Sequence, residues 1–226
     1  MLLTEVIKPN KGVTAVIGSG GKTSLIRALA YELASGSKVL ICSDHAMPAT
    51  GFEHISGRGD IASAARALTA AAAVGMPAVI GELKDGVIRP VKTNIDAAAG
   101  YADYLFLEVD DSRGLPLTAH FSGQPVLPRC TRSVIEVIGL SGLCRPVRMA
   151  ANNAERYAEL AGIDINDFVS PEAAARVINR EALQELLFVN MADSKEWYEE
   201  ARLLCGLVRS HSVIGSLKSP PYSIYM

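Results

Sequence analysis

The sequence lacks an excess of charge of either sign. Its 22 lysines and arginines face 24 aspartates and glutamates, which gives a formal net charge of −2. A protein that binds nucleic acid or an anionic membrane through electrostatics needs a basic surface. We therefore expect no nucleic-acid partner and no membrane partner, and look instead for a small molecule or another protein.

Cysteine is also scarce, and the sequence contains no Cys-x-x-Cys pair. The four cysteines, Cys42, Cys130, Cys144 and Cys205, are far apart in a chain of 226 residues, which is long enough to bury a core without cross-links. This usage is typical of reduced thiols in a reducing compartment. Cys42 and His45 form a single Cys-x-x-His, which without a second pair predicts structure in preference to a metal site.

Long apolar runs and a secretion signal are missing as well. No uncharged run reaches the ~20 residues that a membrane-spanning helix needs, and the first residues, Met-Leu-Leu-Thr-Glu-Val, lack a basic segment followed by an apolar one. Hydrophobic residues nevertheless make up 49% of the chain, which excludes disorder. We expect a cytoplasmic α/β protein with a substantial core.

The most informative stretch runs from residue 13 to residue 24. Residues 13–17, Val-Thr-Ala-Val-Ile, predict a buried parallel strand. Leu25, Ile26, Leu29 and Leu33 then recur at helical spacing, which predicts a helix from Lys22 to about Leu33. A turn that contains three glycines joins the two elements.

This turn has the composition of a phosphate-binding loop. Glycines allow positive φ angles and a close approach of backbone amides to a ligand, and a helix N-terminus adds partial positive charge. Lys22 supplies a cation for phosphates, and Thr23 supplies a hydroxyl for Mg²⁺. We therefore predict a site for Mg²⁺ with ATP or GTP, formed by Gly18, Ser19, Gly20, Gly21, Lys22, Thr23 and Ser24.

The spacing of the loop departs from Gly-x-x-x-x-Gly-Lys-[Ser/Thr], because Val16 occupies the place of the first glycine. The shorter form, Gly18-x-x-Gly21-Lys22-Thr23, resembles the compact P-loop of the Mur ligases. Two alternatives stay open: a glycine-rich turn with a chance lysine, and a dinucleotide fingerprint with Asp44 as ribose ligand. The second lacks its third glycine and leaves Lys22 without a role.

A second apolar stretch, residues 104–109, predicts a buried strand that finishes in acids. Glu108, Asp110 and Asp111 have the Walker B arrangement, in which an acid holds Mg²⁺ or its water opposite the P-loop threonine. We assign Glu108 and Asp110 to the metal and Asp110 also to catalysis, together with Lys22. The alternative is an acidic surface turn.

Arg113 follows these acids and allows two interpretations. Its planar guanidinium suits a phosphate or another oxyanion, which would make it catalytic. It equally suits an ion pair with Asp110 or Asp111. His120, in the next loop, is predicted to be a structural histidine.

The remaining pattern alternates strands with helices. It predicts strands at 38–42, 77–81 and 187–189, helices at 60–73 and 153–160 and from 170 onward, a small hairpin insertion near 78–92, and a non-helical tail at 219–222. This alternation predicts a P-loop NTPase-like three-layer α/β/α fold with a mainly parallel sheet. We expect residues 1–226 to form a single nucleotide-binding domain.

The segment after the strand at 187–189 bears on the choice of base. Asn190-Met-Ala-Asp193 is similar to the Asn-Lys-x-Asp element with which GTPases recognise guanine, where the carboxylate accepts hydrogen bonds from the base. Met191 replaces the lysine that would cover the base. The alternative is that Asp193 or Ser194 caps the following helix.

Four segments together closely resemble the YqeC family of selenium-dependent molybdenum hydroxylase accessory proteins. They are Gly18-Ser-Gly-Gly-Lys-Thr, Glu108-x-Asp110-x-Ser112-Arg113-x-x-Pro116-Leu117, Gln124-Pro-Val-Leu-Pro128 and Val137-Ile-Gly139-Leu140-x-x-Leu143-x-x-Pro146. The resemblance extends from about Gly12 to Leu217. It implies a P-loop NTPase fold and a role in maturing a selenium-containing molybdenum cofactor, with a molybdenum hydroxylase or a cofactor-maturation protein as partner.

Several polar positions of the family pattern differ here. The changed positions are His45, Asp111, Thr118, Gly123, Gln124, Asn152, Asn153 and Met191. The sequence is therefore identified as a divergent member, and three functions remain open. They are a Mg²⁺-dependent NTPase that assists maturation, a nucleotide sensor or scaffold without turnover, and a dinucleotide-dependent oxidoreductase.

Overall fold

A computed structural model of the chain describes residues 2–218 and 223–225. The predicted tail at 219–222 lies outside the described residues. The chain is a mixed α/β protein with a mainly parallel sheet of nine strands flanked by helices, which confirms the predicted fold class. It divides into two compact units, unit 1 (Met1–Val16, Thr23–Asp111, Leu127–Ser133) and unit 2 (Ile17–Lys22, Ser112–Val126, Val134–Met226). Each unit is described by itself.

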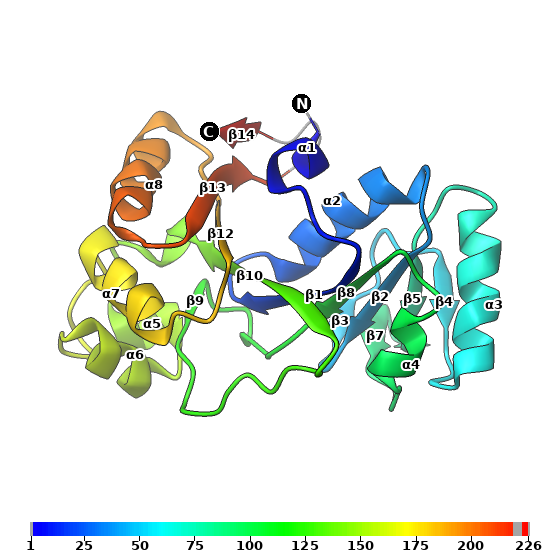
Figure 1. Cartoon of the computed structure of the whole chain (residues 1–226). Coiled ribbons are helices and arrows are strands. Elements are labelled where there is room, and N and C mark those ends of the chain that lie inside the picture. The colour runs from blue at the N-terminus through cyan, green and yellow to red at the C-terminus, as the bar shows by residue number, and fades with distance from the viewer. Residues whose placement is uncertain (1, 219–222, 226) are drawn as a thin grey trace. The chain divides into compact units, whose positions relative to one another are not determined.

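Unit 1 contains the amino-terminal strands and helices (Figure 1). Its elements are α1 (Leu3–Ile7), most of β1 (Gly12–Gly18), α2 (Lys22–Ala34) from Thr23 onward, β2 (Val39–Ser43), β3 (Met47–Pro48), β4 (His54–Ser56), α3 (Ile61–Ala72), β5 (Ala78–Ile80), β6 (Glu82–Lys84), β7 (Val87–Arg89), α4 (Ile95–Ala99) and β8 (Tyr104–Glu108). The strand order β1-β8-β2-β5-β4 is parallel throughout.

The register of these strands fixes one polar edge of unit 1. Val16 of β1 and Ser43 of β2 both lie opposite Glu108 of β8. Because carboxyl ends of parallel strands meet at the same edge, the residues that follow β2 and β8 come together there. The apolar face of α2, Leu25, Ile26 and Leu29, is fully buried, as its helical spacing predicts.

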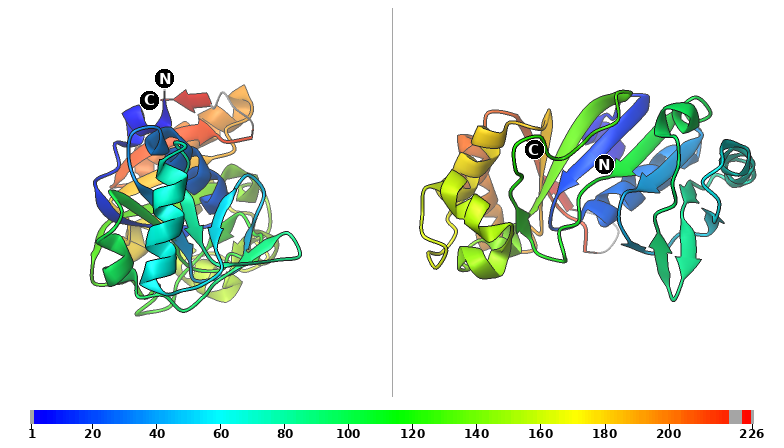
Figure 2. Two further views of the ribbon diagram at one scale, coloured as in Figure 1. Left: turned by 90° about the vertical axis from the view of Figure 1, so that its right-hand side faces the viewer. Right: turned by 90° about the horizontal axis from the view of Figure 1, so that it is seen from below.

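Two further features complete unit 1. The helix α3 packs on β4 and β5, and Asp60 caps it by accepting a hydrogen bond from the Ser63 amide at 2.9 Å (Figure 2, cyan helix in the left view). An antiparallel hairpin joins β6 and β7 through Asp85 and Gly86, which both have positive φ. Such φ values are those that a tight hairpin turn needs.

Unit 2 contains the carboxy-terminal half of the chain. Its elements are β9 (Leu117–Thr118), most of β10 (Thr131–Gly139), η1 (Leu140–Gly142), α5 (Val147–Ala150), β11 (Ala151–Asn152), α6 (Ala154–Ala161), α7 (Pro171–Glu181), β12 (Leu186–Asn190), α8 (Lys195–Leu207), β13 (His211–Ser216) and β14 (Ser223–Tyr225). The strands β10, β12 and β13 are parallel, and β14 pairs with β13 antiparallel.

One apolar core holds unit 2 together. Buried side chains of α5 to α8 pack with those of β10, β12 and β13, and Leu187, Val189 and Leu204 are completely enclosed. Burial of such side chains contributes about 1.5–3 kcal/mol each. The Ser170 hydroxyl caps α7 with Pro171 in the first helical position, as the sequence predicts. Parallel pairing brings Gly139 of β10 opposite Asn190 of β12.

Candidate functional site

The glycine turn between β1 and α2 has a backbone that other residue types cannot adopt without strain. Gly18, Gly20 and Gly21 have φ angles of +87°, +80° and +128°. A Cβ on Gly18 would lie 2.3 Å from the carbonyl oxygen of Val137, and one on Gly20 would lie 2.3 Å from the amide nitrogen of Gly139. The loop therefore packs so closely on the end of β10 that only glycine fits.

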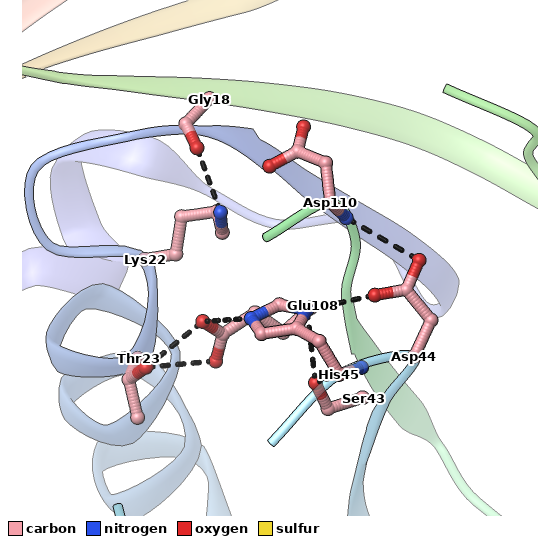
Figure 3. A network of polar contacts seen from close by, with 8 residues as sticks. All are labelled: Gly18, Lys22, Thr23, Ser43, Asp44, His45, Glu108 and Asp110. Atoms are coloured by element: carbon pink, nitrogen blue, oxygen red, sulfur yellow. Dashed lines mark hydrogen bonds and ion pairs between the residues drawn. The ribbon is translucent and has the colours of Figure 1, made fainter. Parts of the chain in front are cut away.

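Lys22 and Ser19 bring buried polar groups to this loop. The Lys22 side chain is only 4% exposed, and its ammonium donates a hydrogen bond of 2.7 Å to the carbonyl of Gly18 (Figure 3). Ser19 is fully buried, and its hydroxyl has no hydrogen-bond partner among the described residues. A buried hydroxyl in this state is uncommon in native proteins, and water or a bound ligand usually satisfies it. The loop thus combines a cation with an unsatisfied hydroxyl.

Asn190 fastens the loop to β12. Its side-chain amide donates to the Gly20 carbonyl at 2.8 Å, and its side-chain oxygen accepts from the Leu217 amide at 3.2 Å. Asn190 is 5% exposed; its contact with Leu217 is buried and its contact with Gly20 is partly buried. The first residue of the Asn-x-x-Asp segment therefore positions the loop itself.

The last residue of that segment, Asp193, is exposed and accepts a hydrogen bond from the Ser216 hydroxyl. The cap of α8 is Ser194, whose hydroxyl oxygen accepts from the Trp197 amide at 3.3 Å. The capping alternative, which named Asp193 or Ser194, is therefore confirmed, with Ser194 as the residue that caps the helix. Met191 has a φ of +70°, and its sulfur accepts a hydrogen bond from Ser141 at 3.1 Å.

In unit 1, Thr23 meets Glu108 at the polar edge of the sheet (Figure 3). The Thr23 hydroxyl lies 2.9 Å from each oxygen of the Glu108 carboxylate and donates to it. Thr23 is half-buried, and the Glu108 side chain is 4% exposed. The predicted metal-binding hydroxyl and acid are therefore adjacent, although 85 residues separate them in the sequence.

His45 extends this contact into a network with two carboxylates. Its Nε2 atom lies 3.3 Å from Glu108 Oε1, and its Nδ1 atom lies 2.7 Å from Asp44 Oδ1. The other Asp44 oxygen accepts from the Asp110 amide at 3.3 Å. A neutral imidazole carries one N–H, whereas an imidazolium donates to both carboxylates. His45 thus bridges the carboxylates of Asp44 and Glu108 at the strand ends.

The four cysteines are all free thiols. Cys42 is buried, and burial raises the pKa of its thiol to about 12. Among the described residues, no group of three or more His, Cys, Asp or Glu side chains is arranged to hold a metal ion. Burial makes Cys42 a small apolar residue of the core.

Comparison of the sequence with known proteins identifies a family. The family model of the YqeC protein matches residues 14–155, which is more than half of the chain. The chain belongs to the YqeC family. It is also 29% identical over 157 residues to the Escherichia coli K12 protein described as "Uncharacterized protein YqeC". That match spans 67% of this chain and 60% of the relative.

The YqeC match includes the glycine loop, Thr23, Glu108 and Asp110, and it ends before Asn190 and Asp193. Two predicted site residues, Arg113 and Ser24, are not buried. Arg113 is exposed in a turn with a φ of +52°, and Ser24 is half-buried in the first turn of α2. Their roles, like those of the other predicted site residues, stay predictions.

Sequence reasoning missed two groups of residues that the fold brings together. It named His45 as part of a Cys-x-x-His and as a changed family position but did not predict its contacts with Glu108 and Asp44, and it gave no role to Glu181, which contacts His120. The position of His45 directly after a predicted parallel strand was an available signal for the first group, because such positions face the ligand edge of a sheet. Residues 2–218 and 223–225 contain no helix that is long and apolar enough to cross a membrane.

Proposed function

We propose that this protein binds a nucleoside triphosphate together with Mg²⁺ and hydrolyses it or transfers its terminal phosphoryl group. The observation that carries the proposal is the glycine loop, which packs too closely for any Cβ and leads directly into Lys22 at the start of α2. The first amides of a helix have no acceptor within the helix, and they favour an anion in front of them. A triphosphate supplies such an anion.

The polar groups of the loop are matched to phosphate oxygens. The buried ammonium of Lys22 donates to the Gly18 carbonyl, and an anionic phosphate oxygen attracts such a cation more strongly than a neutral oxygen does. The Ser19 hydroxyl gains a partner when a phosphate oxygen or an ordered water reaches it. Both groups therefore favour the nucleotide-bound state over the unbound state.

Thr23 and Glu108 fit the requirements of Mg²⁺. The ion prefers hydroxyl, carboxylate and phosphate oxygens and retains several waters, so one or two protein ligands suffice. Thr23 and Glu108 would hold it, and Mg²⁺ supplies neutralisation of phosphate charge. The residues of this chain position the phosphates through Lys22, and Asp110, which follows β8, is the proposed site for orienting the attacking water.

Asp193 is the proposed determinant of the base, with guanine preferred over adenine. Its carboxylate is exposed and oriented by Ser216, while Asn190 fastens the phosphate loop to the same segment. A carboxylate only accepts hydrogen bonds, and guanine offers it two adjacent N–H donors, at N1 and N2. Adenine does not offer this pair of donors. A site built for these donors rejects bases that lack them.

A thermal-shift titration tests the binding proposal. A ligand at ~100 times its Kd stabilises by about 2.7 kcal/mol, which raises Tm by roughly 5–10 °C for a chain of this size. We expect this shift with magnesium GTP, a smaller one with magnesium ATP and none with NAD. Lys22→Ala should abolish it, whereas Lys195→Ala, which removes an exposed lysine from the same position of α8, should not. Equal shifts for both variants would contradict the proposal.

Release of inorganic phosphate separates an enzyme from a nucleotide sensor. Turnover that Lys22→Ala abolishes identifies an NTPase, and tight binding without phosphate release identifies a sensor or scaffold. Stabilisation by NAD alone would support the dinucleotide alternative.

The resemblance to accessory proteins of selenium-dependent molybdenum hydroxylases supports a role for this nucleotide cycle in maturation. We propose a molybdenum hydroxylase or a cofactor-maturation protein as the partner. Co-purification of the candidate partner in the presence of GTP, and its loss with GDP, tests this role.

A further inference from the structure

A separate cavity of about 270 Å³ lies within unit 2. Its lining includes His120 and the segment 121–124, together with Arg156 of α6 and Arg180 and Glu181 of α7. The helices α6 and α7 pack against each other (Figure 1). Arg156 of α6 and Arg180 of α7 both line this cavity. None of the lining residues belongs to the phosphate loop, so the cavity is a site of its own.

A buried pair of His120 and Glu181 forms one wall. His120 is 6% exposed, and the Glu181 side chain is 4% exposed. One Glu181 oxygen accepts from the His120 backbone amide, and the other lies 2.9 Å from Nδ1 of the ring. An ionised carboxylate only accepts hydrogen bonds, so Nδ1 carries a proton and the ring is held in one orientation. Glu181 thus positions His120 and offsets part of the positive charge.

The two arginines are positioned mainly by neutral backbone groups. Arg156 donates through Nε to the His120 carbonyl at 3.2 Å and through Nη1 to the exposed Glu159 carboxylate at 2.7 Å. Arg180 donates through Nη1 to the Leu160 carbonyl at 2.6 Å. Within the described residues, no carboxylate lies at ion-pair distance from Arg180. The lining carries two guanidinium groups and one carboxylate, and therefore a net positive charge.

These features select a ligand by size and by charge. The cavity is slightly smaller than the ~300–1,000 Å³ typical of drug-sized ligands, which favours a ligand smaller than a nucleoside triphosphate. Guanidinium groups match the geometry of carboxylate and phosphate oxygens through paired hydrogen bonds. We propose that this cavity binds a small molecule bearing an oxyanion, with Arg156 and Arg180 as its ligands and His120 positioned beside it by Glu181.

Isothermal titration of the full chain with two probes tests the proposal. Inorganic phosphate represents a tetrahedral oxyanion and malonate a carboxylate, each measured against sodium chloride of equal ionic strength. We expect saturable binding of at least one probe, and the preferred probe identifies the kind of oxyanion. Arg156→Gln and Arg180→Gln should each weaken binding about tenfold or more, because each removes charge-assisted hydrogen bonds.

The matched control is Arg202→Gln, which removes an exposed arginine of the same unit that pairs with Glu199. It should leave the Kd of the probe unchanged. Arg180→Lys keeps the charge but loses the planar fork, so intermediate binding is expected, and this variant serves where Arg180→Gln fails to fold. Absence of saturable binding to both probes, or equal weakening by Arg180→Gln and Arg202→Gln, would overturn the proposal.

Discussion

Replacement of Asn190 by alanine tests whether this residue holds the phosphate loop in place. The buried side chain makes two hydrogen bonds, a partly buried one to the Gly20 carbonyl at 2.8 Å and a buried one from the Leu217 amide at 3.2 Å. Alanine leaves both backbone groups without a partner, at a cost of about 1–3 kcal/mol each. We expect the free energy of unfolding to fall by about 2–6 kcal/mol, and Tm to fall by roughly 4–24 °C.

The same substitution should weaken nucleotide binding about tenfold or more, because the Gly20 peptide loses its anchor. Asn179→Ala is the matched control. Asn179 also donates to one backbone carbonyl, that of Leu207 at 2.8 Å, and accepts from one amide, that of Arg209 at 2.9 Å, but in an exposed setting. We expect it to cost only about 1 kcal/mol, since water replaces exposed partners, and to leave nucleotide affinity unchanged.

Asn190→Asp adds a pH test of the same contact. A protonated carboxyl can donate to the Gly20 carbonyl, whereas a carboxylate in this buried place faces an oxygen, so folding raises the pKa of the new side chain. The folded state then binds more protons than the unfolded state, and stability falls as pH rises above about 4. The Tm of this variant should therefore drop relative to the natural chain between pH 5 and pH 8. The anchoring role is refuted if Asn190→Ala has the same Tm as the natural chain, or if it weakens nucleotide binding no more than Asn179→Ala does.

Three other predictions concern the base, the metal and the thiols. Asp193→Asn should reduce the preference for GTP over ATP and favour XTP, because the amide of asparagine can donate to the additional carbonyl of xanthine. Competition binding measures this preference, and unchanged selectivity would show that Asp193 does not contact the base. Glu108→Gln removes the acid that accepts from Thr23, so the additional stabilisation that Mg²⁺ gives in a GTP thermal shift should disappear. Part of the shift measured without magnesium should remain. Undiminished magnesium dependence would contradict the role of Glu108 in holding Mg²⁺. Burial raises the pKa of Cys42 to about 12 while the unfolded thiol ionises near 8.5, so the folded state retains the proton and stability falls with increasing pH by at most about 1.4 kcal/mol per unit above 8.5. Urea unfolding at pH 8 and pH 10 should show this loss in the natural chain but less of it in Cys42→Ser, and equal losses would show that Cys42 does not titrate in this way.

The local sequence determined the strand, the glycine turn and the helix between residues 12 and 34. A run of β-branched and apolar residues, three glycines and a 3.6-residue period are properties of consecutive residues, so a linear reading detects them. The caps of α7 and α8 were predictable for the same reason, since a capping serine contacts an amide three residues further along. The alternation of strands and helices likewise determined the fold class.

Only the tertiary structure decided what the polar residues contact. Asn190 reaches Gly20 across 170 positions of the sequence because parallel pairing puts Gly139 and Asn190 at the same strand end. His45 meets Glu108 because the register between β2 and β8 aligns Ser43 with Glu108. Hydrogen bonds depend on direction and distance, and a shift of one residue in register would turn these side chains to the opposite face of the sheet. Composition and periodicity do not encode that register, so sequence named the candidate residues and the folded chain determined their partners.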